Sequence, residues 1–238
     1  TIDTACRLIL EAKYKLGLFA NPYKYCDLKR PARDIFTPEH RAVARRIAGE
    51  SFVLLKNEPS TDRAGSNPSG STVQPVLPLQ GNIAVIGPLA DTRTNMPGTW
   101  SVAAILDKSP SLIEGLKEMT AGKATILYAK GSNLTSDAAY EERATLFGRS
   151  LHRDARTDAQ LLQEALTVAQ KADVIVAALG ESSEMSGESS SRTSLDIPDV
   201  QRTLLKELLK TGKPVVLVLF TGRPLTLEWE QAHVPAIL

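Results

Sequence analysis

Four short apolar runs punctuate the sequence, and segments with helical spacing of apolar residues lie between them. The runs are residues 83–87, 124–128, 174–179 and 214–220, and the helical segments are 112–119, 161–169 and 199–209. An unbroken apolar run is typical of a strand that is buried on both faces of a parallel sheet, whereas apolar and polar residues alternate in a strand with one solvent-exposed face. Strands that alternate with helices predict an α/β fold, here a three-layer α/β sandwich with helices on both faces of a mostly parallel sheet.

The first 55 residues carry two further helical patterns. Apolar residues recur at helical spacing from Ile2, and Gly17 is a stop signal. Prolines and tyrosines in residues 21–36 indicate a linker. Thr37 is a typical N-cap followed by proline at the first helical position, so a second helix is expected to begin there, with apolar positions that continue to Leu55.

Composition and motifs exclude several classes of function. The chain has 28 basic and 27 acidic residues, and this net charge of +1 gives no electrostatic footprint for nucleic acid. No apolar run approaches the ~20 residues of a membrane span. There is no glycine-rich nucleotide fingerprint, P-loop or G-x-S-x-G elbow, and the three histidines lie far apart in the sequence. We therefore expect no nucleic-acid or membrane partner, no metal and no cofactor.

The candidate chemistry lies directly after the run 174–179, in a segment that we call the acidic loop (residues 181–197). It carries three glutamates, Glu181, Glu184 and Glu188, among seven serines. Ligands of open α/β sheets bind beyond the carboxyl ends of the strands, where this loop must lie. Phosphate would require basic side chains or glycine-cradled amides, so the loop favours a polyhydroxylated neutral ligand, a sugar. Trp100, on an earlier loop, could stack on a sugar ring or simply cover the sheet edge.

Several segments resemble glycoside hydrolase family 3, in its periplasmic β-glucosidase branch. Its second domain is similar to IAVIGP (83–88), ALGE (178–181), SGESSSR (186–192) and TGRPL (221–225), and AKYKLGLF (12–19) resembles the end of its catalytic barrel. The resemblance covers nearly the whole chain.

This resemblance implies a domain organisation. Residues 1–20 would be the end of an N-terminal TIM-barrel domain that is otherwise absent from the chain, 21–36 a linker, and 37–238 the α/β sandwich, truncated at its end. The lack of an initial methionine and the apolar segment that starts just before Leu238 also lead us to expect part of a longer protein, with an unpaired sheet edge after the last residue.

The resemblance also implies a function. Members hydrolyse β-glucosides or β-xylosides with retention: an aspartate of the barrel attacks the anomeric carbon, and a glutamate of the second domain protonates the leaving oxygen. The expected substrate is a β-glucoside or oligosaccharide, the expected partner is the barrel of the same chain, and the expected location is the periplasm or outside the cell. The alternative is a sugar-binding α/β module without catalysis.

Among the three glutamates, Glu188 is the predicted acid. It matches the Ser-Gly-Glu position of the family, and the missing Cβ of Gly187 would permit the sharp turn that projects it outwards. Glu181 is expected to be fixed by the backbone of the loop, and nothing frees the backbone of Glu184. Arg192 is expected mainly to hold the loop, with a contact to a substrate hydroxyl left open. Trp100 and Arg192 are thus the candidate substrate-binding residues.

Overall fold

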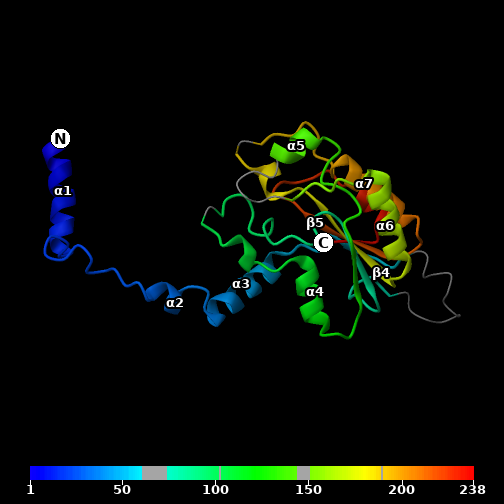
Figure 1. Cartoon of the computed structure of the whole chain (residues 1–238), viewed down its shortest axis with the longest axis horizontal. Helices are drawn as coiled ribbons and strands as arrows, with labels where there is room; N and C mark the ends of the chain where they lie inside the picture. Colours follow the sequence, from blue (N-terminus) through cyan, green and yellow to red (C-terminus); the bar gives the residue numbers. More distant parts are fainter. Residues whose placement is uncertain (61–73, 102, 144–150, 189) are drawn as a thin grey trace. The chain divides into compact units, whose positions relative to one another are not determined.

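The structure, a computed structural model, describes residues 1–60, 74–101, 103–143, 151–188 and 190–238 (Figure 1). Contacts divide the chain into two compact units, Thr1–Phe52 and Val53–Leu238. The first contains three helices, α1 (Ile2–Lys15), α2 (Arg30–Asp34) and α3 (Pro38–Ser51). The expected linker thus includes the short helix α2. No helix within the described ranges is long and apolar enough to cross a membrane.

The start of α3 is as predicted, but its end is not. Thr37 Oγ1 accepts a hydrogen bond from the His40 amide at 3.2 Å, which is the expected N-cap. The helix stops at Ser51, because the next residues are extended and the Leu55 amide donates to the Ile237 carbonyl at 2.9 Å. Pairing with a strand far along the chain therefore overrides the helical pattern that continued to Leu55.

The second unit is built on a six-stranded sheet in the order β1-β6-β5-β4-β2-β3. Its strands are β1 (Lys56–Asn57), β2 (Ile83–Ile86), β3 (Ile126–Ala129), β4 (Val174–Gly180), β5 (Val215–Phe220) and β6 (Ala236–Ile237). All neighbours are parallel except β1 and β6, which pair antiparallel. We expected the last strand to be an unpaired edge of the sheet, but β6 pairs with β5 on one side and with β1 on the other. The sequence of β1 carried no strand signal.

Helices pack on both faces of this sheet (Figure 1). They are α4 (Leu112–Thr120), α6 (Asp158–Gln170), α7 (Asp199–Leu209) and α8 (Glu228–His233). Tyr140 of the short helix α5 (Ala138–Arg143) packs instead in a separate cluster with Leu89, Leu134 and Met185. Side chains of β4 alternate between two cores: Ile175 and Leu179 pack with α6 and α7, whereas Val176 packs on the other side with Ile113 of α4. Every residue of β4 is buried. The predicted α/β fold with a mostly parallel sheet is confirmed, and the unbroken apolar run is explained by burial on both faces.

Two glycines allow central strands to end where other backbone approaches closely. Gly87 follows β2 with φ +140°, and a Cβ there would lie 2.1 Å from the Ala178 carbonyl oxygen. Gly180 ends β4 with φ +130°, and its Cβ would lie 1.9 Å from the Phe220 carbonyl oxygen. Both positions therefore require glycine for space as well as for backbone conformation.

This geometry predicts a strong effect of Gly180→Ala. We expect it to lower the free energy of unfolding by roughly 3 kcal/mol or more, because backbone of β4 or β5 must move to admit the methyl group. The matched control is Gly115→Ala inside α4, where a Cβ meets nothing within 4 Å. That change should stabilise the chain by about 0.5–1 kcal/mol. Urea unfolding followed by circular dichroism measures both, and equal effects of the two substitutions would contradict this account.

Candidate functional site

The acidic loop starts from a fixed point at the carboxyl end of β4. Gln201 of α7 has no exposed surface and binds both polar groups of the last strand residue: its Oε1 accepts from the Gly180 amide at 2.8 Å, and its Nε2 donates to the Gly180 carbonyl at 2.9 Å. The same Nε2 donates to the Leu134 carbonyl at 2.7 Å, in the segment after β3. One side chain thus ties the end of β4 to α7 and to a neighbouring loop.

Glu181, the first residue of the loop, is held by two guanidinium groups. Its side chain has no exposed surface, and its Oε1 lies 2.7 Å from Arg192 Nη1 and 3.2 Å from Arg223 Nε. Thr221 Oγ1 donates to the other oxygen at 3.2 Å. Glu181 is fixed, but by side chains from within the loop and from the segment after β5, rather than by the backbone of the loop as expected.

Glu184 lies in a short 3-10 helix, η3 (Ser183–Ser186), and is buried. Thr99, from the long segment after β2, donates to its carboxylate at 3.3 Å. In the same segment Asn95 accepts from the Ser183 amide at 2.7 Å. These two contacts pack the segment that carries Trp100 against the acidic loop.

Glu188 differs from the other two glutamates because it is exposed. The sharp turn expected at Gly187 is not present: this residue has φ −68° and ψ 164°, an extended conformation that any residue adopts. A Cβ at Gly187 would instead lie 3.1 Å from Thr99 Oγ1, which is tighter than most such contacts. Glycine is favoured here by the close approach of Thr99, and not by a special backbone turn.

The two candidate substrate-binding residues occupy different surroundings. Trp100 follows Thr99 directly and is 69% exposed, so its ring is available for stacking. Arg192 is only 10% exposed in its side chain, and its Nη2 donates to the Asp196 carbonyl at 2.7 Å while Nη1 binds Glu181. These contacts are those of a residue that holds the loop. A substrate contact for either residue stays a prediction.

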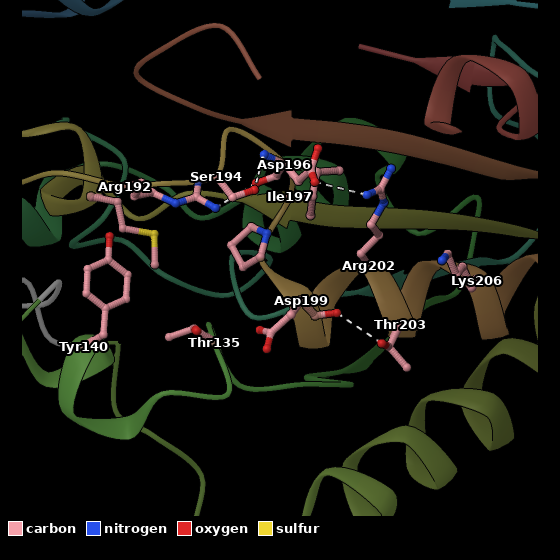
Figure 2. Close-up of a pocket in the computed structure, with 12 residues that line it drawn as sticks. Thr135, Tyr140, Arg192, Ser194, Asp196, Ile197, Asp199, Arg202, Thr203 and Lys206 are labelled. Atoms are coloured by element: carbon pink, nitrogen blue, oxygen red, sulfur yellow. Dashed lines mark hydrogen bonds and ion pairs between the residues drawn. The ribbon is translucent and has the colours of Figure 1, made fainter. Parts of the chain in front are cut away.

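A hollow of about 380 Å³ lies beside the end of the acidic loop, where α7 begins. Figure 2 shows Arg192, Asp196 and Arg202 along one side of it and Asp199 with Thr203 along another. Arg202 Nη1 lies 3.4 Å from Asp196 Oδ2, and Thr203 Oγ1 donates to the Asp199 carbonyl at 3.1 Å. Burial alone would raise the pKa of Asp199, but hydrogen bonds to its carboxylate outweigh burial and keep the pKa below its usual value. Around the hollow, Arg202 and Asp196 thus form an ion pair, whereas the Asp199 carboxylate accepts from the amide and hydroxyl of Ser136.

Sequence reasoning missed the side chains that hold the loop, namely Thr221, Arg223, Gln201 and Asn95. A signal existed for two of them. Gln201 is a polar residue on the buried stripe of α7, three residues before Leu204, and such a position usually means a buried hydrogen-bonding role. Arg223 follows β5, whose carboxyl end lies beside that of β4. The hydrogen bond that Asn95 accepts from the Ser183 amide had no comparable signal, because it depends on how two loops meet.

The arrangement can present one carboxyl group for proton transfer. Glu181 is engaged by two arginines and Glu184 is buried, so Glu188 is the member of the three that an external ligand can reach. Among the described residues there is no group of three or more side chains suited to holding a metal ion. A proton donor at the rim of a sheet suits acid or base chemistry on a ligand bound above it.

Comparisons with known proteins identify the family of the chain. The family model described as "Glycosyl hydrolase family 3 C-terminal domain" matches residues 52–238. The chain is 40% identical to the periplasmic β-glucosidase of Salmonella typhimurium, covering all of this chain and 30% of that protein. It is 32% identical to a β-xylosidase of Formosa agariphila, covering all of this chain and 29% of that protein.

A solved structure is similar as well. The β-glucosidase from Listeria innocua in complex with isofagomine superposes with a TM-score of 0.70 at 28% identity, over 96% of this chain and 26% of that one. This chain thus spans about a third or less of the length of the relatives that it matches. Because the family model covers most of the sequence, the chain belongs to glycosyl hydrolase family 3, whose C-terminal domain it contains.

Proposed function

We propose that this chain supplies the general acid/base residue, Glu188, to a retaining β-glycosidase whose nucleophile lies in a barrel domain outside residues 1–238. The observation that carries the proposal is the different environment of three glutamates in one loop. Glu181 and Glu184 are buried and bonded to other side chains, whereas Glu188 is exposed. A general acid must be within hydrogen-bond reach of the leaving oxygen, which a buried, ion-paired carboxylate cannot be.

In the proposed reaction a carboxylate of the barrel attacks the anomeric carbon while Glu188 donates its proton to the departing glycosidic oxygen. The ionised Glu188 then takes a proton from water, and this water attacks the anomeric carbon and releases the barrel carboxylate. Retention of this kind requires two carboxyl groups ~5–5.5 Å apart. The barrel is therefore proposed to close over the acidic loop and to bring its carboxylate opposite Glu188.

The proposed substrates are β-glucosides or β-xylosides, because the relatives are named for these two activities. Trp100 is proposed to stack on a sugar ring beside Glu188. The periplasm or the cell exterior is the proposed location, in line with the name of the Salmonella typhimurium relative. We also propose that residues 1–20 end the barrel, that 21–36 connect the domains and that 37–238 form the sandwich domain.

The alternative hypothesis for the same loop is a sugar-binding module without catalysis. Both hypotheses use exposed polar groups at the carboxyl edge of the sheet. They differ in what Glu188 does. If Glu188 only binds the sugar, its substitution should weaken affinity. If Glu188 is catalytic, its substitution should slow a chemical step, and the loss of rate should depend on the leaving group.

Glu188→Ala in the longer protein tests the proposal. Substrates with poor leaving groups should slow by ~10²- to 10⁴-fold, because they need the proton, while activated aryl glycosides should be affected far less. Added azide should restore the rate by trapping the glycosyl-enzyme. Steady-state kinetics on a series of aryl and alkyl β-glucosides measures both effects.

Glu184→Gln is the matched control, because it removes a carboxylate of the same loop that is buried against Thr99. It should show neither the dependence on leaving group nor rescue by azide. If Glu184→Gln shows both and Glu188→Ala shows neither, Glu188 is not the acid.

The 238-residue chain by itself should hydrolyse no aryl β-glucoside, since a general acid without a nucleophile held opposite cannot complete the retaining reaction. The measurement is release of the aryl group by the purified chain over buffer. Sustained turnover that Glu188→Ala abolishes would place a complete site within these residues and overturn the two-domain proposal.

A further inference from the structure

We propose that Glu181, Arg192 and Arg223 form a positioning cluster that fixes the acidic loop on both sides of Glu188 and so sets the efficiency of its proton transfer. The inference rests on the proposed function, in which Glu188 is the acid. In this inference the three residues act without touching the reacting atoms, and the separate prediction of a substrate contact for Arg192 plays no part in it. They act through the loop.

The centre of the cluster is the carboxylate of Glu181. It has no exposed surface, and two guanidinium groups that are only 10% and 22% exposed approach the same oxygen at 2.7 and 3.2 Å. The Glu181 amide is also held, donating to the Phe220 carbonyl at 2.8 Å. The start of the loop is thus anchored through both its backbone and its side chain, at the end of the central strand.

Each arginine uses a second nitrogen to hold the backbone of the loop. Arg192 Nη2 donates to the Asp196 carbonyl at 2.7 Å, and Arg223 Nη2 donates to the Met185 carbonyl. The cluster therefore touches the loop at four places, residues 181, 185, 192 and 196. Glu188 lies between two of them, three residues after Met185 and four before Arg192.

The fork of the guanidinium is what makes this possible. A planar group with five donors in fixed directions can bind a carboxylate and a carbonyl at once, whereas a lysine ammonium on a flexible stem cannot hold both in one geometry. Arg192→Lys therefore keeps the charge opposite Glu181 but loosens one of the two contacts. Since a displacement of about 1 Å can cost two orders of magnitude in rate, such loosening should be visible in proton transfer.

The chain offers a matched control in a second buried ion pair. Glu230 has no exposed side-chain surface and lies 2.9 Å from Arg202 Nε, so the pair resembles that of Glu181 and Arg192 in burial and distance. It joins α7 to α8. It meets the acidic loop at the far end, where Arg202 Nη1 lies 3.4 Å from Asp196 Oδ2. Arg202→Lys should destabilise the fold to a similar degree without loosening the loop around Glu188.

Hydrogen exchange of the 238-residue chain tests the positioning directly and independently of catalysis. In peptides that cover residues 182–188, Arg192→Lys should speed amide exchange by about tenfold, while Arg202→Lys should leave it within about twofold of the unchanged chain. Arg223→Lys serves as a second variant if Arg192→Lys does not fold. Equal exchange in the Arg192 and Arg202 variants would overturn the inference.

Kinetics of the longer protein test the consequence. Arg192→Lys should lower kcat for alkyl β-glucosides by about tenfold or more, with little change in KM and a smaller loss for activated aryl glucosides. Both limbs of the pH profile should remain, because the acid is still present. Arg202→Lys should show no dependence on leaving group. If Glu188→Ala lacks its expected pattern, the proposed function fails; if Glu188→Ala has it but Arg192→Lys behaves like Arg202→Lys, only the positioning role fails.

Discussion

The candidate site depends on how the central strand leaves the sheet. β4 has neighbours on both sides and is buried on both faces, so it cannot shift without disturbing two cores. At Gly180 the backbone turns against the Phe220 carbonyl in a space that excludes a Cβ. The amide and carbonyl of Gly180 both bind the side chain of Gln201, so the backbone polar groups at the end of the strand are paired. The loop therefore departs from a position that the whole sheet determines.

Three glutamates within eight residues lie in three different environments. A carboxylate that loses its hydration must be paired, and two guanidiniums do this for Glu181. Thr99 covers Glu184 from the segment after β2. Glu188 keeps its contact with solvent, so an external ligand can reach its carboxyl group. Such buried pairs contribute little net stability, because desolvation of the charges offsets their attraction, but removal of one partner leaves a buried charge unpaired and is strongly destabilising.

The sequence patterns predicted strands β2 to β5 and helices α4, α6 and α7 of the second unit, because burial leaves a local signature, but they did not predict β1, β6, α5 or α8. They were wrong where a distant segment decides. The helical pattern up to Leu55 gives way at Ser51 because the Leu55 amide pairs with the Ile237 carbonyl. Gly187 is extended, and the reason for glycine is Thr99, which approaches from a segment almost 90 residues earlier. In both cases a contact between residues far apart in the sequence decides the local structure or the residue type.

By itself, then, the sequence determined the α/β architecture, the buried strand at residues 174–179 and an acidic, hydroxyl-rich loop at its carboxyl end, because hydrophobic period and composition are local properties. Only the tertiary structure decided which carboxylate is buried and which is exposed. The partners of Glu181 come from two different segments, and Arg223 reaches it only because β5 lies beside β4. The environment of a charge depends on what the fold brings near it, and no local pattern along the chain records that.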